Sequence, residues 1–416
     1  MWAFAKKTFT HFYNDSLYRN SVYLMLSTAV MAAFGFVFWL VNARFYSAEQ
    51  IGLATTLISV ASFITNFSML GFNNSLVRFL PTSNNKNEKI NTGFTLIIIA
   101  TVILSLGFII GLPYFSPRLM FLREHIVFEI LFVLFMVFAS LNSIVDTVFV
   151  AYRSSVYVLI KNTLWSILKL SLPLFFIYLG AWGIFSSISI ATIVAALFSV
   201  LVLVKKFAYR PGLRVSREVV KKLGTYSTGN YIAGIIGGLP TMILPVMITN
   251  RLGPEMAAYY YMPMMIANLL YIIPQATARS FFAEGSYSES NLRSYYTSYV
   301  RINILLLVPA AILLYSFGYQ ILSLFGLRYA TGGYGLLKLL LITSILIVIN
   351  SLGTAILNIN RRISKLVFIN LLFASLLLIL INTLNTNDLI GVGTSWLFSH
   401  FLVSGVYIFI FRKLSM

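Results

Sequence analysis

Few side chains in this sequence could do chemistry, and most of those that could are cations and amides set inside apolar runs. The chain contains no cysteine, which excludes disulfides, thiolate metal sites and cysteine nucleophiles. Its three histidines (His11, His125 and His400) are scattered, so no metal-binding cluster is expected. No Gly-x-x-x-x-Gly-Lys-Ser/Thr phosphate loop is present either. The sequence therefore predicts no cofactor and no enzymatic step. The chemistry that these side chains can still do is to bind anions through the cations and to form hydrogen bonds through the amides.

Polar residues recur at helical spacing in three of the apolar runs. Within each run they are three, four or seven positions apart, which places them on one face of a helix. They are Thr55, Ser59, Ser62, Asn66 and Asn73 in the first run, Ser227, Asn230, Gly234, Gly237 and Thr241 in the second, and Tyr261, Asn268, Tyr271, Gln275 and Arg279 in the third. Such faces are either packing surfaces between membrane helices or the lining of a polar cavity. Both interpretations stay open.

Four arginines lie at corresponding places in the two halves of the chain. Arg44 in "VNARFYSAEQIG" and Arg251 in "ITNRLGPEMAAY" each end an apolar run before a short turn with an acid, and they are 207 positions apart. Arg78 in "NNSLVRFLP" and Arg279 in "PQATARSFF" each end the following run, 201 positions apart. This recurrence predicts an internal repeat.

The elements that carry these residues are expected to be transmembrane helices. The 416 residues are 59% hydrophobic and 10% charged, with a mean hydropathy of +0.88, far more apolar than a soluble core of this length could use. Runs of spanning length are predicted at 20–43, 51–74, 92–115, 126–150, 157–179, 182–204, 225–249, 256–277, 299–317, 335–357, 366–384 and 389–411. The sequence thus predicts an all-α polytopic membrane protein with about twelve transmembrane helices.

The net charge of +19 is distributed in a way that indicates topology. Most cations, Lys161 among them, are assigned to the N-terminus, to every second loop or to the 205–222 connection. The opposite side has only Arg44, Arg118, Arg123, Arg251, Arg328 and Lys338. By the positive-inside rule both termini are then cytoplasmic, and a nucleic-acid partner is not expected.

Four parts of the chain are expected. Residues 1–19 form an interfacial N-terminal segment, residues 20–204 the N-lobe with helices 1–6, residues 205–222 a basic cytoplasmic linker, and residues 223–416 the C-lobe with helices 7–12. Because six spans per half is even, the lobes should be related by a pseudo-two-fold axis along the membrane normal, with a site between them. The linker's positive charge suits the anionic inner leaflet; a regulatory or partner-docking role is the alternative.

One further charge lies inside the predicted N-lobe. Lys169 is in the middle of the fifth span, and Asp146 lies one or two turns inside the cytoplasmic end of the fourth. Charge at this depth is costly and usually faces protein or water. Lys169 therefore either pairs with Asp146 or faces a cavity, where it would attract an anion.

The stretch "ARFYSAEQIGLATTLISVASFITNFSMLGFNNSLVRFLP" (43–81), after an aromatic-rich first helix, resembles the first helical hairpin of bacterial and archaeal polysaccharide flippases. These proteins handle lipid-linked oligosaccharides such as O-antigen precursors and belong to the multidrug/oligosaccharidyl-lipid/polysaccharide exporter superfamily. The specific letters are confined to 20–81 and 245–282. The resemblance implies two six-helix lobes in a V around a central cavity, lined by helices one, two, seven and eight. It also implies that a polyprenyl-diphosphate-linked oligosaccharide is flipped from the cytoplasmic to the outer leaflet of the cell membrane.

If the resemblance holds, the expected substrate-binding residues come from the polar helix faces, from the repeated arginines and from Lys169. Arg78 and Arg279 would share the diphosphate through their guanidinium groups, unless each is a positive-inside anchor that snorkels to headgroups. The full expected set is Arg78, Arg279, Lys169, Asn66, Asn73, Asn230, Asn268, Gln275, Arg44 and Arg251. A monomer is the default, and a polysaccharide polymerase or glycosyltransferases are possible protein partners.

The alternative function is that of a multidrug and toxic compound extrusion antiporter, which exchanges H⁺ or Na⁺ for organic cations. Those proteins resemble this architecture but use carboxylates in helix one or seven. Neither span contains an Asp or Glu here, so a drug cation would lack a partner. A membrane-embedded polymerase or ligase is disfavoured because the outer loops are short.

Overall fold

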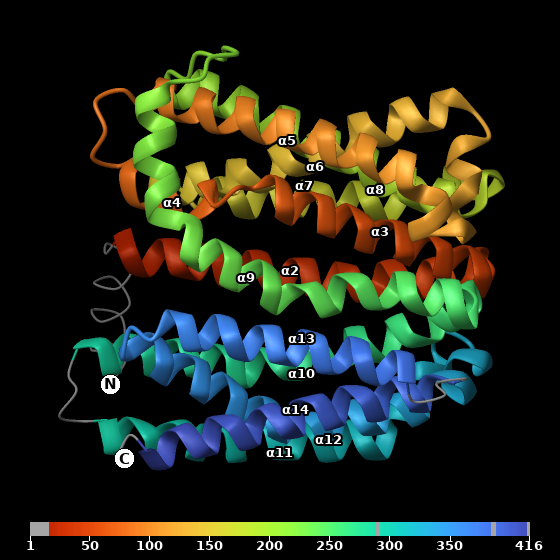
Figure 1. The fold of residues 1–416 in the computed structure, drawn as a ribbon. Helices are drawn as coiled ribbons and strands as arrows, with labels where there is room; N and C mark the ends of the chain where they lie inside the picture. Colours follow the sequence, from red (N-terminus) through yellow and green to blue (C-terminus); the bar gives the residue numbers. More distant parts are fainter. Residues whose placement is uncertain (1–15, 288–291, 384–387, 414–416) are drawn as a thin grey trace, which may run out of the picture. The chain divides into compact units, whose positions relative to one another are not determined.

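The computed structural model describes residues 16–287, 292–383 and 388–413, which are almost entirely helical and include no β-strand. The first half contains α2 (Ser16–Phe45), α3 (Ala48–Ser68), α4 (Phe72–Phe79), α5 (Lys86–Phe115), α6 (Ile126–Ala151), α7 (Val156–Ser171) and α8 (Gly180–Phe207). Short 3-10 turns lie at Pro117–Arg123, Leu172–Phe175 and Ile177–Leu179. The second half contains α9 (Arg217–Leu252), α10 (Pro254–Tyr287), α11 (Leu292–Ser323), α12 (Leu327–Ile359), α13 (Ile363–Thr383) and α14 (Leu389–Lys413) (Figure 1).

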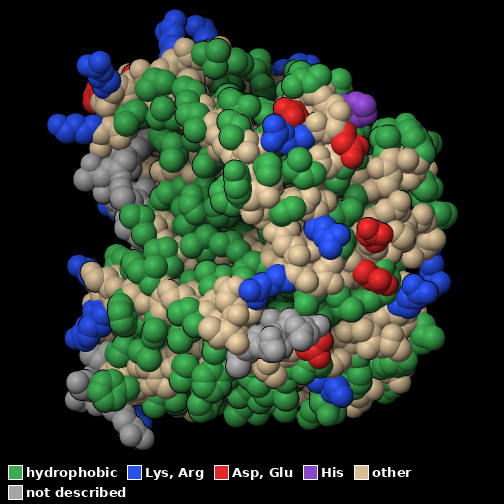
Figure 2. Space-filling model, turned by 45° about the vertical axis from the view of Figure 1, so that its right-hand side comes forward, with side chains coloured by type: hydrophobic (Ala, Val, Ile, Leu, Met, Phe, Trp, Pro, Cys, Tyr) green, Lys and Arg blue, Asp and Glu red, His purple; other side chains and the backbone are tan. Residues whose placement is uncertain are grey.

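Twelve helical segments among the described residues are long and apolar enough to cross a membrane, which confirms the predicted number of spans. Figure 2 shows hydrophobic side chains over much of one face, with few charged side chains among them. The ninth span, predicted as the short run 299–317, belongs to a longer helix, since α11 runs for 32 residues. The predicted N-terminal segment lies largely outside the described residues.

Two predicted spans end earlier than expected. The run 51–74 stops as a helix at Ser68, because Leu70 and Gly71 both have positive φ angles (49° and 78°) and α4 then starts as a separate helix. The run 157–179 is α7 followed by two 3-10 turns, with Pro173 in the first of them. Proline cannot donate the backbone hydrogen bond that would continue the helix there.

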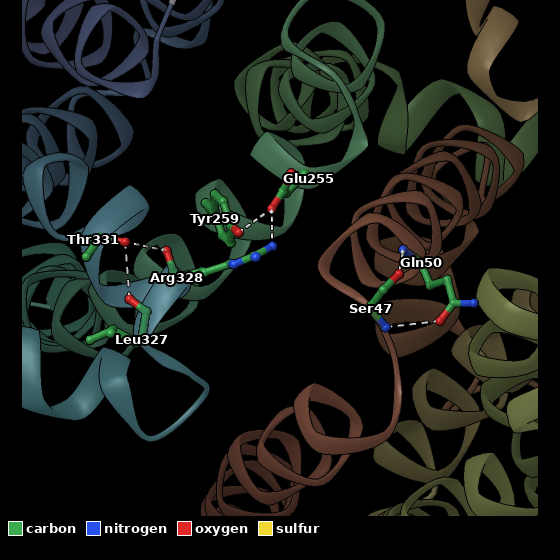
Figure 3. Close-up of polar contacts among 7 residues, drawn as sticks. All are labelled: Ser47, Gln50, Glu255, Tyr259, Leu327, Arg328 and Thr331. Atoms are coloured by element: carbon green, nitrogen blue, oxygen red, sulfur yellow. Dashed lines mark hydrogen bonds and ion pairs between the residues drawn. The ribbon is translucent and has the colours of Figure 1, made fainter.

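The two similar turns noted in the sequence are built differently (Figure 3). The first is a capping box: Ser47 N–H donates to Gln50 Oε1 at 3.0 Å, and Gln50 N–H donates to Ser47 Oγ at 3.2 Å. The second is Gly253, at φ 96°, followed by a proline as the first residue of α10. Glu255, in the first turn of α10, accepts a hydrogen bond from Tyr259 and lies 3.9 Å from an Arg328 guanidinium nitrogen.

The first turns of α3 are in contact with the end of α9 and the start of α10. A Cβ atom on Gly52 would lie 1.6 Å from the Pro254 carbonyl oxygen, so only glycine allows α3 to approach the start of α10 this closely. One turn further along α3, the Thr56 and Thr249 hydroxyls are hydrogen-bonded. These contacts place the first turns of α3 with the helices of the second half.

The described chain accordingly forms two compact units that do not divide at the linker. Unit 1 contains the described residues up to Tyr46 and then residues 60–231, and unit 2 contains residues 47–59 and the described residues from 232 onward. In unit 1, α2 packs on α7, and α6 packs on α5 and α8. In unit 2, α12 is central and packs on α10, α11 and α14.

Candidate functional site

The two sequence-predicted site residues that the structure brings together are Gln275 and Arg279. They lie one turn apart on α10 and line a cavity of about 360 Å³ between α10 and α12 in unit 2. From α12 the cavity is lined by Ser351, Thr354 and Asn358, at spacings of three and four, so they share one face of that helix. Ala278 and Ala355, which also line the cavity, belong to the core cluster that joins α10, α11 and α12 beneath it.

Five of the eight described residues that line this unit 2 cavity have polar or charged side chains, and they carry one kind of charge. Arg279 is the one charged residue among the described residues that line it, and none of those residues is an Asp or Glu. The Arg279 side chain is exposed and makes no hydrogen bond or ion pair with another described residue. The guanidinium therefore keeps its donors for an anion, and the amides and hydroxyls beside it can bond to further oxygens.

Ser351, Thr354 and Asn358 were not predicted. The signal was present, because Ser351 and Thr354 lie in the predicted span 335–357 and Asn358 directly follows it at the spacing of the same helical face. It was missed because polar faces were predicted only on helices two, seven and eight. The Thr354 hydroxyl is already in contact with the Tyr407 hydroxyl at 3.1 Å, which fixes its place in the wall.

In unit 1 the predicted site residue Lys169 is buried between α2 and α7. Its Nζ lies 4.1 Å from the centre of the Trp165 ring and 5.3 Å from that of Phe38. The indole is held in place because its N–H donates to Thr192 Oγ1 at 2.9 Å. Lys169 makes no ion pair with a described residue. Its ammonium is thus packed on two ring faces, an arrangement that stabilises a cation by cation–π attraction.

The predicted pairing of Lys169 with Asp146 is wrong. Asp146 Oδ1 lies 2.6 Å from the Nζ of Lys161, which is completely buried and also donates to the Asn142 carbonyl oxygen at 3.2 Å. Lys161 had been counted with the charges on the cytoplasmic side, but it lies within α7 and neutralises a carboxylate. Lys169 is therefore left as a buried cation with no acid beside it.

The polar face predicted for the second span is interrupted by the helix break. Thr55 and Ser59 are buried, and their hydroxyls bond to carbonyl oxygens of α3 itself. Asn66 is exposed and donates to the Ser62 carbonyl at 2.8 Å. Asn73 and Arg78 are exposed on α4, a different helix, where the Arg78 guanidinium lies 5.5 Å from the Phe79 ring centre. The prediction that these five polar residues share one continuous helical face was wrong.

Two further predicted site residues in unit 2, Arg251 and Asn268, do not line the unit 2 cavity. Arg251 donates from Nη1 to the Ile381 carbonyl oxygen at 2.8 Å, in the last turn of α13, where helix carbonyls lack intrahelical partners. Arg44 is exposed in the last turn of α2. Asn268 is exposed on α10, three residues before the buried Tyr271, whose hydroxyl donates to the Leu340 carbonyl. Asn230 lies in α9, but its side chain is outside the described residues.

Comparison with known proteins gives one family match. Residues 17–281 match the family described as polysaccharide biosynthesis protein, which covers well over half of the chain. None of the curated proteins matches this chain.

Several solved transporter structures share the fold. An inward-facing multidrug resistance MATE family transporter of the MOP superfamily is 14% identical, with a TM-score of 0.70, over 95% of this chain and 97% of that one. An outward-facing multidrug resistance MATE family transporter of the MOP superfamily is 13% identical, with a TM-score of 0.64, over 96% of this chain and 94% of that one. A MOP superfamily transporter from Pyrococcus furiosus, described as having a binding pocket of reverse polarity that suggests a different function, is 15% identical, with a TM-score of 0.60, over 96% and 95%. At such identities the likeness establishes the two-lobed transporter fold and no cargo.

Proposed function

The chain belongs to the polysaccharide biosynthesis protein family and has the fold of a multi-pass membrane transporter, and from this premise we propose its cargo and direction. It flips a polyprenyl-diphosphate-linked oligosaccharide from the cytoplasmic to the outer leaflet by alternating access, for the biosynthesis of a cell-surface polysaccharide. It acts as a transporter without an enzymatic step.

The observation that carries this proposal is the lining of the unit 2 cavity. A diphosphate joined to a sugar offers phosphate oxygens beside many hydroxyl groups. Arg279 supplies a guanidinium fork for the phosphate, while Gln275, Ser351 and Asn358 supply donors and acceptors for hydroxyl groups. Among the described lining residues, a cationic drug would meet an arginine and no carboxylate.

The charge inside unit 1 has the same sign. Lys161 is neutralised by Asp146, so the buried positive charge that remains in this part of unit 1 is that of Lys169. Buried charge in a membrane protein is costly and is usually retained for a function. A cation at this depth would lower the energy of an anionic group that crosses the apolar layer.

The membrane potential supplies a driving force of the required direction. A diphosphate diester carries about two negative charges, and a potential that is negative inside favours the outward movement of each by about 2.3 kcal/mol per 100 mV. Flipping can therefore proceed without a coupled ion.

We place the protein in the cell membrane with both termini cytoplasmic, from the positive-inside rule. Because the chain has no cysteine, single cysteines can be labelled one at a time. A cysteine at Glu124 should react with an impermeant maleimide added outside intact cells, whereas one at Asn84 should react only after permeabilisation. Both side chains are exposed, so burial does not explain a difference. External labelling at Asn84 would contradict the twelve-span topology.

The function is tested with purified protein in vesicles. Outward movement of a fluorescent polyprenyl-diphosphate oligosaccharide should depend on the protein and be faster with an inside-negative potential. Deletion of the gene should leave the lipid-linked precursor on the inner leaflet and barely change sensitivity to cationic dyes. Dye efflux by the purified protein, with glycan export intact in the deletion strain, would support a cation antiporter instead. In this proposal the protein works as a monomer. A glycosyltransferase nearby would supply its cargo, or a polysaccharide polymerase would use it.

A further inference from the structure

The segment that joins α8 to α9 is bound along the start of α5. We call residues 208–216 the strap. Asn91 holds it with three hydrogen bonds: its Nδ2 donates to the Arg210 carbonyl at 3.0 Å, and its Oδ1 accepts from Gly212 N–H at 3.2 Å and from the Tyr209 hydroxyl at 2.6 Å. Asn87 Oδ1 accepts from Arg210 N–H at 3.1 Å. The strap is therefore an ordered structure bound to unit 1 (Figure 1).

Both ends of the strap are anchored as well. The Tyr209 ring is buried and packs edge-on against Phe94 of α5, with 5.9 Å between ring centres. Burial raises the pKa of Tyr209 to about 12, so its hydroxyl stays a donor to Asn91 at any physiological pH. At the other end, Ser216 N–H donates to Thr92 Oγ1 at 3.1 Å, and α9 starts at the next residue. The backbone of the strap is consequently held at both ends.

The strap presents an apolar tip surrounded by cations. Leu213 is 82% exposed and Val215 is 47% exposed, although the backbone on either side of them is fixed. Arg210, Arg214 and Arg217 are exposed and form no ion pair with a described residue. Between Lys205 and Arg217 the sequence has five cations and no acid. An ordered loop that exposes a leucine among arginines is typical of a surface that binds the headgroup region of a membrane.

The position of the strap along α5 fits that environment. Asn87, Asn91 and Thr92, to which it is bound, lie at the point where α5 changes from polar residues to its apolar membrane-spanning run. We therefore expect the strap to lie level with the boundary between water and lipid. We propose that the strap is a docking surface for anionic phospholipid headgroups, with Leu213 inserted between them and Arg210, Arg214 and Arg217 on their phosphates. The surface does not depend on the identity of the cargo, so glycan flipping can succeed or fail without bearing on it.

The test uses a single cysteine at position 213 of the otherwise cysteine-free full-length chain, labelled with an environment-sensitive fluorophore. In nanodiscs of phosphatidylcholine with phosphatidylglycerol, the emission should be shifted to the blue relative to phosphatidylcholine alone, and high salt should reduce the shift. The triple variant R210Q/R214Q/R217Q should lose most of the lipid-dependent shift. The matched control R361Q/R362Q/K365Q, which removes three exposed cations elsewhere on the predicted cytoplasmic side, should keep it.

Equal emission in the two lipid compositions would overturn the proposal, because Leu213 would then not respond to anionic lipid. A shift that appears only when an acidic soluble protein is added, at constant lipid composition, would indicate a protein partner and would likewise overturn it. The variant N91A removes the main anchor while leaving every arginine in place, so it should weaken the shift. A full emission shift in N91A would show that lipid binding does not need the ordered strap, and this would also overturn the proposal.

Discussion

Lys161 and Lys169 lie two turns apart on α7, yet their surroundings give them different roles. Lys161 forms an ion pair with Asp146, whereas Lys169 is packed on the Trp165 and Phe38 rings. Removal of one partner of a buried ion pair leaves an uncompensated charge, which costs about 3 kcal/mol or more. Removal of a buried charge that has no partner carries no such cost. The two lysines therefore form a matched pair for separating stability from function.

We expect Lys161→Met to destabilise the protein and Lys169→Met to leave it folded but inactive. Thermal unfolding in detergent should show a clear loss of stability for the first, restored in part by the double change Lys161→Met/Asp146→Asn. For the second, an unchanged or higher Tm should accompany a loss of flipping in vesicles. Normal flipping by Lys169→Met would mean that this lysine only fills space between α2 and α7.

Arg279 should be sensitive even to replacement by lysine. A planar guanidinium can donate two hydrogen bonds to one phosphate group, and an ammonium cannot reproduce that geometry. Because one charge-assisted hydrogen bond is worth about 1.5 kcal/mol, Arg279→Lys should lower the rate of flipping about tenfold. An exposed anchor that only meets headgroups, such as Arg361, should tolerate the same change. Full activity of Arg279→Gln at normal protein level would remove Arg279 from the site.

The site was partly predictable at this scale. Gln275 and Arg279 were found because helical spacing alone brings residues four apart onto one face. The partner of Asp146 was not, because α7 offers two lysines and only the rotation of the helix against α6 decides between them. The role of Arg251 was missed for a similar reason: its acceptor is a backbone carbonyl 130 residues away, and sequence patterns carry no information about such contacts.

Among the elements, spans were easier to predict than their ends. Twelve apolar stretches follow from hydropathy, since lipid requires a helix of about 20 apolar residues wherever the chain crosses. The break after Ser68 was not predicted, because the residues around Leu70 and Gly71 are as apolar or small as those inside the helix. The break is stabilised from outside: the Tyr231 hydroxyl donates to the Phe67 carbonyl, which the ending helix leaves without its usual partner.

Gly52 is the element-scale position whose replacement should matter most. A methyl group there would collide with the Pro254 carbonyl, which is backbone and cannot move aside cheaply. Overpacking of this kind costs about 1–3 kcal/mol, so Gly52→Ala should lower the Tm and the amount of folded protein. Gly107 of α5 is the matched control, since nothing lies within 4 Å of the place its Cβ would take. Gly107→Ala should be neutral or stabilising, as is usual within a helix. Equal Tm values for the two variants would contradict the close approach of α3 to α10.

On the scale of the whole molecule, the sequence repeat is reflected in a contact between its two copies. The turns at Ser47 and Gly253 end corresponding helices of the two halves, and residues on α3, α9 and α10 close to these turns pack together in unit 2. The repeat itself was predictable, because similar turns and equal span counts are visible in the letters. The assignment of residues 47–59 to unit 2 was not, since it depends on contacts about 200 residues away in the chain.

Alternating access gives this contact a testable role. Thr56 belongs to the first repeat and Thr249 to the second, and their hydroxyls are hydrogen-bonded near the end of α3 that is predicted to be outermost. If the cargo leaves outward between the repeats, these residues must separate once in every cycle. In the cysteine-free chain, the pair Thr56→Cys/Thr249→Cys should form a disulfide under mild oxidation, stop flipping, and recover activity on reduction.

The control for this prediction is a second pair of hydroxyls in contact, Ser68 and Ser140, whose oxygens are 3.0 Å apart between α3 and α6 of unit 1. Both residues belong to the first repeat, so a disulfide there should leave flipping largely intact. The comparison isolates the effect of joining the repeats from the effect of adding a cross-link to α3. If the cross-linked Thr56→Cys/Thr249→Cys protein flips its substrate at the full rate, the contact stays closed throughout the cycle. The cargo must then leave by a route that does not part α3 from α9.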